Sequence, residues 1–173
     1  MPIVFTAVLI FSLLIGLPAA KAQTEDEIPF ESRWYIGPTY QMDNITLPTD
    51  STVASDQLMG LTGFHRMNPY FGTGASLFFT PQDSSIALQL NSRWIWPLPI
   101  VEPYVGANLH YLSRDGGGLS IVFQPGLQIQ ALPFPLLFDI YALARYDIVS
   151  AVFNNQYQQA ARFGLGASVL FQL

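Results

Sequence analysis

Apolar and polar residues alternate with a period of two along most of this chain, and the alternation is clearest at its end. In the last segment the residues between the apolar ones are small or polar, with Leu170 as the exception. Alternation of this kind is typical of a β-strand with two unlike faces. The apolar face of this predicted strand consists of Ala161, Phe163, Leu165, Ala167, Val169, Phe171 and Leu173.

The same pattern recurs along the chain between turn signals, and no segment after the N-terminal one shows helical periodicity. It predicts eight strands, at about 32–42, 57–66, 70–80, 85–96, 104–113, 119–132, 137–149 and 159–173. Proline cannot donate a hydrogen bond to a strand ladder, so the strands should stop at Pro97–Pro103 and at Pro133–Pro135. Strands of about ten residues or more can cross a bilayer when tilted. We therefore predict an all-β fold, an eight-stranded antiparallel up-and-down transmembrane β-barrel.

The alternation alone does not say which face points outward. A soluble lipocalin-like barrel would turn its apolar faces inward around a ligand, whereas a membrane barrel would turn them toward lipid. Bulky aromatic residues near both ends of the apolar faces favour the membrane barrel, because such residues form girdles at the two membrane interfaces. The predicted girdle consists of Trp34, Trp94, Trp96, Tyr40, Tyr111, Phe123, Tyr146 and Phe163.

Charged residues make up only 11% of the chain, against about 25% in ordinary soluble domains. An arginine facing lipid at mid-bilayer would cost about 2–4 kcal/mol, so charges within strands should point into the lumen. There they must pair, because an unpaired buried charge is unfavourable. The predicted lumenal network consists of Arg33, Arg93, Asp139, His110, Arg145, Asp147 and Arg162. His65 or Arg66 is expected close to one end of this network.

The remaining acidic residues are assigned to the tail, loops and turns. Asp43, Asp50, Asp56 and Asp115 are expected in solvated extracellular loops, where loose binding of divalent cations is an alternative. The short connections should lie on the periplasmic side and the longer polar ones outside. No basic surface is left for nucleic acid to bind.

The N-terminal segment has the features of an export signal. Ile3–Leu17 is apolar, and Ala20-Lys21-Ala22 matches a signal-peptidase site. We therefore expect a signal peptide at residues 1–22, a short disordered lead-in at 23–31, and the barrel at 32–173. The absence of cysteine excludes a lipid-modified cysteine, a disulfide scaffold and thiolate metal sites.

Two stretches resemble a known family. Val101–Leu109 is similar to a strand start common among small OmpA-like and opacity-type outer-membrane barrels, and Phe163–Phe171 is similar to their final strand. The resemblance implies location in the outer membrane of Gram-negative bacteria and insertion by the barrel-assembly machinery. That machinery would read the terminal signal that includes Phe171 and Leu173. The implied partners are outer-membrane lipid and lipopolysaccharide, and we expect a monomer.

The family includes adhesins, structural barrels and small pores, so the role stays open. The first hypothesis is a structural or surface-interaction barrel with a lumen plugged by charged and polar side chains. The alternatives are a narrow, porin-like pore for ions or small solutes, and a lipid-A-modifying hydrolase. For the hydrolase, His110 and Ser113 have opposite strand parity and no carboxylate stands in an obvious third role. We therefore predict no catalytic residue, no cofactor and no metal site. Gly72-Thr73-Gly74 and Gly164-Leu165-Gly166 precede no helix that could hold a phosphate.

Overall fold

The computed structural model describes residues 30–44, 56–82, 84–113, 118–131, 134–150 and 161–173. Eight strands lie in this part of the chain, all of them within the compact unit Ser32–Leu173. They are β1 (Arg33–Asn44), β2 (Asp56–Asn68), β3 (Phe71–Thr80), β4 (Ser85–Ile95), β5 (Val101–Leu112), β6 (Gly118–Ala131), β7 (Leu136–Ser150) and β8 (Ala161–Gln172). The predicted signal peptide, its cleavage after Ala22 and the lead-in up to Pro29 lie outside the described residues.

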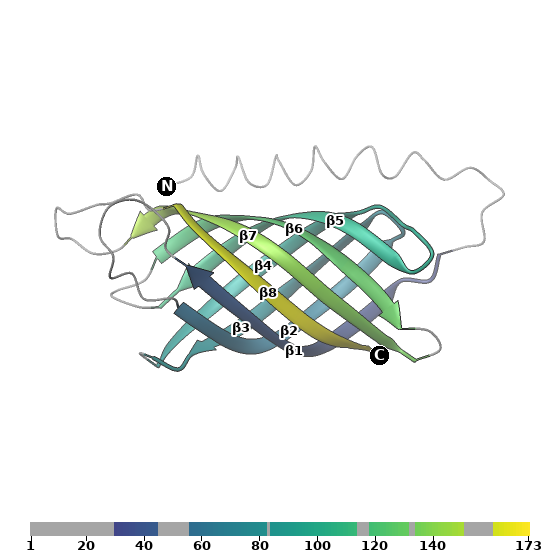
Figure 1. Ribbon diagram of the computed structural model, residues 1–173, viewed down its shortest axis with the longest axis horizontal. Coiled ribbons are helices and arrows are strands. Elements are labelled where there is room, and N and C mark those ends of the chain that lie inside the picture. Colours follow the sequence, from purple (N-terminus) through teal and green to yellow (C-terminus); the bar gives the residue numbers. More distant parts are fainter. Residues whose placement is uncertain (1–29, 45–55, 83, 114–117, 132–133, 151–160) are drawn as a thin grey trace. The chain divides into compact units, whose positions relative to one another are not determined.

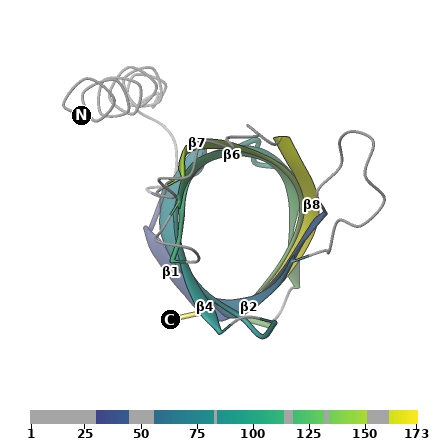
Figure 2. The same cartoon turned by 90° about the vertical axis from the view of Figure 1, so that its left-hand side faces the viewer.

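Each strand pairs with the next one along the chain, and β8 pairs with β1, which closes the sheet (Figures 1 and 2). All pairs are antiparallel, and Tyr35 lies opposite Gln172 across the closing seam. The prediction of a closed eight-stranded antiparallel barrel is confirmed. Closure leaves no strand edge unpaired, which is how such barrels satisfy their backbone hydrogen bonds without disulfides.

The connections between the strands lie at the two ends of the barrel. We call the end where β1 begins and β8 ends the C-terminal rim; it carries the turns β2–β3, β4–β5 and β6–β7 and is the right-hand end in Figure 1. We call the opposite end the loop rim. The C-terminal rim corresponds to the side that the sequence predicts to be periplasmic.

The sequence-based start of the fifth strand is wrong, because β5 begins at Val101 and includes Pro103. Trp96 and Pro103 lie opposite each other, and the backbone N–H of Trp96 donates to the carbonyl of Pro103 at 2.9 Å. In such a pair, an N–H at position 103 would have donated to the carbonyl of Trp96. Since β4 already ends at Ile95, the missing donor costs no ladder hydrogen bond. Glu102 is consequently a strand residue rather than a loop residue.

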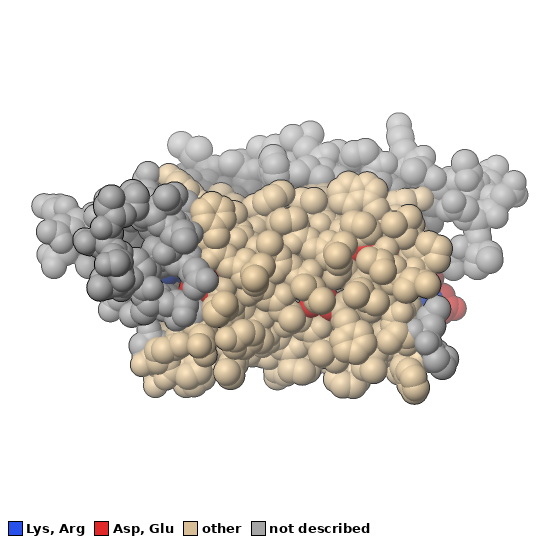
Figure 3. All heavy atoms as spheres, viewed as in Figure 1, with Lys and Arg blue, Asp and Glu red and all other residues tan. Residues whose placement is uncertain are grey.

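The outer wall of the barrel is apolar. Leucine, isoleucine, phenylalanine and tyrosine side chains of every strand are exposed there, and charged atoms are visible only in small patches of the wall in Figure 3. Contiguous exposed apolar surface of this extent is unusual for a water-soluble monomer. The wall therefore has the composition of a surface that contacts an apolar phase.

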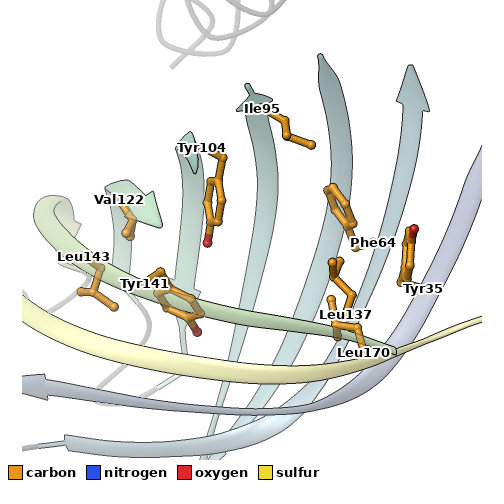
Figure 4. Packing of buried hydrophobic residues seen from close by; sticks show 9 residues of the cluster. All are labelled: Tyr35, Phe64, Ile95, Tyr104, Val122, Leu137, Tyr141, Leu143 and Leu170. Atoms are coloured by element: carbon orange, nitrogen blue, oxygen red, sulfur yellow. The ribbon is translucent and has the colours of Figure 1, made fainter. Parts of the chain in front are cut away.

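The interior contains both apolar and polar side chains. Phe64, Tyr35, Leu137 and Leu170 point inward and pack together, as Figure 4 shows. Leu170, the exception in the alternation of the last strand, is therefore a member of an internal apolar cluster. The buried polar residues include Arg93, Asp139, His110, Gln124 and Gln128 among many others.

Two interior glycines make room for tyrosine rings. A Cβ atom at Gly126 would lie 2.5 Å from the hydroxyl oxygen of Tyr104, its direct neighbour on β5. A Cβ atom at Gly166 would lie 2.3 Å from the ring of Tyr141, its direct neighbour on β7. Each ring therefore lies flat over the glycine of the adjacent strand, and this close approach fixes where its hydroxyl group points.

Candidate functional site: the charged interior

Three ion pairs can be described inside the barrel, and none of them joins neighbouring strands. Arg66 of β2 pairs with Glu102 of β5, Arg93 of β4 with Asp139 of β7, and Arg145 of β7 with Asp43 of β1. Because the partners come from strands that are not adjacent in the sheet, each pair bridges the lumen. The three pairs also follow one another along the barrel axis, from the C-terminal rim to the loop rim.

Arg66 and Glu102 form the pair at the C-terminal rim. Two guanidinium nitrogens of Arg66 donate to the two carboxylate oxygens of Glu102, at 2.6 and 2.8 Å. Nη2 of Arg66 also donates to the carbonyl of Pro69 at 2.8 Å. A bidentate arginine–carboxylate pair is among the strongest of the charged hydrogen bonds. It fixes the β2–β3 turn to the opposite wall of the barrel.

Arg93 lies in an aromatic cage. Its guanidinium carbon lies 4.8 Å from the ring centre of Phe64 and 4.7 Å from that of Tyr104. Nη1 of Arg93 lies 2.8 Å from Oδ2 of Asp139, whose Oδ1 accepts a hydrogen bond of 2.8 Å from the hydroxyl of Tyr104. Arg93 is only 2% exposed and Asp139 is completely buried. The ring faces and one carboxylate together replace the water that the charge has lost.

Arg145 lies in a more polar environment. Its Nη1 contacts a carboxylate oxygen of Asp43 and lies 3.5 Å from Nε2 of His110. The other carboxylate oxygen of Asp43 accepts a hydrogen bond of 2.8 Å from the side-chain amide of Gln41. Nδ1 of His110 lies 3.3 Å from the amide oxygen of Gln89. Here hydrogen bonds from amide side chains, rather than aromatic rings, surround the ion pair.

Uncharged polar side chains fill the space between the ion pairs. The hydroxyls of Thr62 and Ser76 lie 2.8 Å apart, and the amide of Asn91 donates to Ser76 at 3.0 Å. The amide of Gln89 donates to Asn91 at 2.8 Å, which connects this group to His110. On the other side, the amide of Gln124 donates to the hydroxyl of Tyr104 at 2.9 Å. Hydrogen bonds thus continue from the cage of Arg93 toward the environment of Arg145.

The structure places the predicted lumenal residues as follows. His110, Arg93, Asp139 and Arg145 are buried inside the barrel. Arg33 and Arg162 are half-buried and lie at β-register positions opposite Arg66 and Arg145. Asp147 lies in β7 opposite Ser120, but its side chain is outside the described part of the chain.

Two acidic partners were missed by the sequence reasoning. Asp43 was expected in an extracellular loop, but it is a completely buried residue of β1. Glu102 was expected in a proline-rich connection, and it is a buried residue of β5. The alternation could have identified Asp43, because Asp43 lies on the same odd-numbered strand face as Arg33, Tyr35 and Thr39. For Asp50 and Asp115, also expected in loops, the structure gives no description; Asp56 lies at the start of β2.

His65 and Arg66 have opposite orientations. Arg66 points into the lumen, whereas the His65 ring stacks on Trp34 with ring centres 4.1 Å apart and planes within 5° of parallel. Trp34 is among the exposed aromatic residues of the outer wall.

Of the other predicted girdle residues, Trp94 is half-buried against Phe71, and the rest are exposed on the wall: Trp96, Tyr40, Tyr111, Phe123, Tyr146 and Phe163.

His110 and Ser113 do not form a pair. His110 is buried in the lumen, whereas Ser113 is exposed and its hydroxyl accepts a hydrogen bond of 2.9 Å from the backbone N–H of Ile86.

Among the described residues, no group of three or more histidine and acidic side chains could hold a metal ion. No helix in the described ranges is long and apolar enough to cross a membrane.

The fold and the distribution of its side chains define a class: a closed up-and-down barrel with a charged, hydrogen-bonded interior and an apolar wall. The chain is similar to the crystal structure of Neisserial surface protein A (NspA), with a TM-score of 0.54 and 14% sequence identity over 83% of this chain and 100% of that one. It is also similar to a de novo designed transmembrane β-barrel, with a TM-score of 0.50 and 13% identity over 82% of this chain and 95% of the designed one. No family model and no curated protein matches the sequence.

These similarities establish the fold, a closed eight-stranded antiparallel β-barrel. A designed barrel lies nearly as close to this chain as a natural surface protein does. The shared geometry is therefore what the comparisons detect, and function has to be argued from the side chains of this chain.

Proposed function

We propose that this protein is an integral β-barrel of the bacterial outer membrane with a structural or surface-interaction role, and that its lumen is plugged by its own side chains. The observation that carries the proposal is the inverted distribution of polarity: charges paired inside the barrel and large apolar side chains outside it. In water this arrangement would expose the wall and bury the ions, whereas in a bilayer both surfaces are matched to their surroundings.

The plug is supported by the contents of the lumen. The interior of an eight-stranded barrel is just wide enough for side chains to fill. Arginines, tyrosines and a phenylalanine extend into it here, and the ion pairs join walls that face each other. Moving a solute through would require separating at least one buried ion pair, which is unfavourable by several kcal/mol per uncompensated charge.

The proposal includes the partners and the route of assembly. All eight strands are paired within one chain, which supports a monomer. The wall would contact membrane lipid and, at the loop rim, lipopolysaccharide. Phe171 and Leu173 at the end of β8 are exposed, so the barrel-assembly machinery would have access to them before the barrel is surrounded by lipid.

The first test is heat modifiability. We expect the detergent-folded protein to migrate differently on a gel before and after boiling, together with a β-type circular dichroism spectrum. Solubility without detergent and no mobility shift would contradict a membrane barrel. The barrel would then have to be a soluble one.

The second test separates a plugged barrel from a narrow pore. The pore is the second candidate because polar and charged side chains line the lumen from the C-terminal rim to the loop rim. In planar bilayers we expect no sustained conductance from the unaltered protein. Steady single-channel steps that change on Arg145→Ala, but not on the outward-facing substitution Leu88→Ala, would contradict the plug and support the pore.

A further inference from the structure

Three adjacent strands carry a row of polar side chains on the otherwise apolar outer wall. This polar row consists of His65 in β2, Thr73 in β3 and Ser92 in β4, and each is the direct neighbour of the next across the sheet. All of them are half-buried, whereas the lumenal residues Asn91 and Arg93 on either side of Ser92 are buried. Direct neighbours on one face of a sheet have Cβ atoms about 5 Å apart, so these side chains can contact the same ligand.

The side chains of the polar row have few hydrogen-bond partners in the protein. The Thr73 hydroxyl lies 4.0 Å from the sulfur of Met67, which is a weak acceptor. Among the described residues, no hydrogen bond involves the Ser92 hydroxyl or a ring nitrogen of His65, whose ring face is stacked on Trp34. A polar group without a partner is unfavourable against hydrocarbon. The partners of the polar row therefore come from outside the protein.

The wall is recessed next to the polar row. Gly63 in β2 and Ala75 in β3 are direct neighbours and follow the row toward the loop rim. A Cβ atom at Gly63 would have no neighbour within 4 Å. At the same level on either side lie Ile36 in β1, exposed by 44%, and Leu90 in β4, exposed by 50%. The two small residues therefore form the floor of a shallow apolar recess between larger aliphatic side chains, with the polar row at one end.

The aromatic girdle indicates the depth of the polar row in the proposed membrane orientation. Phe71 and Trp94 are direct neighbours on the same face, one pair closer to the C-terminal rim than Thr73 and Ser92, and their ring centres are 5.6 Å apart. One such step along the strands spans about 7 Å. Girdle aromatics lie at the level of the lipid head groups. The polar row therefore lies on the acyl-chain side of the head groups, at the level of the ester groups that join the chains to glycerol.

We propose that His65, Thr73 and Ser92 form a binding site for one diacyl glycerophospholipid of the leaflet at the C-terminal rim. The hydroxyls of Thr73 and Ser92 donate to its ester carbonyls, the edge of the stacked His65 ring faces its glycerol, and the first part of one acyl chain lies in the recess. The occupant is a lipid because an ester carbonyl only accepts hydrogen bonds, which matches the hydroxyl donors, and because the recess is continuous with the apolar wall. The inference rests on the proposed membrane location and adds a specific ligand to it.

Native mass spectrometry of the detergent-folded protein tests this site with two lipids of equal chain length. One is a diester phosphatidylcholine, and the other is its dialkyl ether analogue, which lacks the carbonyls. Thr73→Val/Ser92→Ala removes both hydroxyls with little change of shape, and Gly63→Leu fills the recess. Tyr40→Phe is the matched control, because it removes an exposed hydroxyl from the part of the wall nearer the loop rim. Each variant is first checked for heat modifiability.

We expect the unaltered protein and Tyr40→Phe to retain the diester lipid several-fold better than the ether analogue. The double variant should lose this preference, and Gly63→Leu should retain both lipids less well. Equal retention of the two lipids by the unaltered protein, an unchanged preference in the double variant, or undiminished retention by Gly63→Leu would overturn this inference and leave the proposed function intact. Solubility without detergent and no heat modifiability would overturn both. A dimer of the unaltered protein that is lost in the double variant would identify a second copy of the chain as the occupant and would also overturn the inference.

Discussion

The two halves of the barrel interior stabilise a buried arginine by different means. Near the C-terminal rim, Arg93 lies between two aromatic faces and has a single carboxylate, Asp139, that is itself completely buried. Toward the loop rim, Arg145 contacts Asp43 and the His110 ring, and amide side chains bond to these two partners in turn. An aromatic cage can replace hydrogen-bond acceptors around a cation, but the single carboxylate then compensates a larger share of the buried charge.

Asp139→Ala should have the largest effect on the free energy of unfolding. The substitution leaves the Arg93 charge without its carboxylate in a dry, aromatic environment, so we expect a loss of about 3–5 kcal/mol in unfolding free energy. Guanidinium-induced unfolding of the protein folded into vesicles measures it. The double variant Arg93→Met/Asp139→Leu, which removes both charges, should recover much of the loss. Equal stabilities of Asp139→Ala and the unaltered protein would contradict the role of the pair.

Asp43→Ala should have a smaller effect on unfolding. Arg145 keeps the ring nitrogen Nε2 of His110 at 3.5 Å, a polar partner that Arg93 lacks, so we expect a loss of about 1–3 kcal/mol. The same denaturant experiment, run alongside Asp139→Ala, tests the order of the two. A greater loss for Asp43→Ala would mean that the amide network compensates the charge less well than the aromatic cage does.

The backbone of the barrel offers a matched pair of glycines on one strand, β2. A Cβ atom at Gly60 would lie 1.9 Å from the backbone oxygen of Leu77, whereas a Cβ atom at Gly63 would have no neighbour within 4 Å. We expect Gly60→Ala to cost about 1–3 kcal/mol because the adjacent strand must shift. Gly63→Ala should change stability by about 0.5 kcal/mol or less. Unfolding of the two variants side by side checks this, and similar midpoints would argue against close strand contact at Gly60.

The smallest predicted effects concern the two tyrosine hydroxyls. The Tyr104 hydroxyl makes short hydrogen bonds to Asp139 and Gln124, whereas the Tyr141 hydroxyl has only long contacts, 3.4 Å to Thr39 and 3.5 Å to Gln41. Tyr104→Phe should cost about 1–2 kcal/mol and Tyr141→Phe about 0.5 kcal/mol. Both variants keep the ring over its glycine, so a difference between them reports on the hydroxyl alone. The reverse order would show that the Tyr104 hydroxyl contributes less to stability than its two short hydrogen bonds imply.

Much of the fold follows from local pattern. The alternation within each segment predicted the eight strands, their order and the residues that share a face, because side-chain direction alternates along any strand. It failed where a local rule was too strict. Pro103 was expected to stop a strand, but the missing donor lies beyond the end of the neighbouring strand. Asp43 was assigned to a loop because its neighbours are polar, and its parity with Thr39 and Gln41 was the better guide.

The partners of the charges were beyond the reach of the sequence. Arg66 and Glu102, Arg93 and Asp139, and Asp43 and Arg145 are far apart in the chain and lie on strands that are not adjacent in the sheet. Which of them meet depends on how far each strand is displaced relative to the next around the closed barrel, and on the depth at which each side chain reaches the lumen. Strand and face are local properties that each segment determines by itself. Pairing across the lumen is a property of the closed barrel as a whole, and only the tertiary structure decided it.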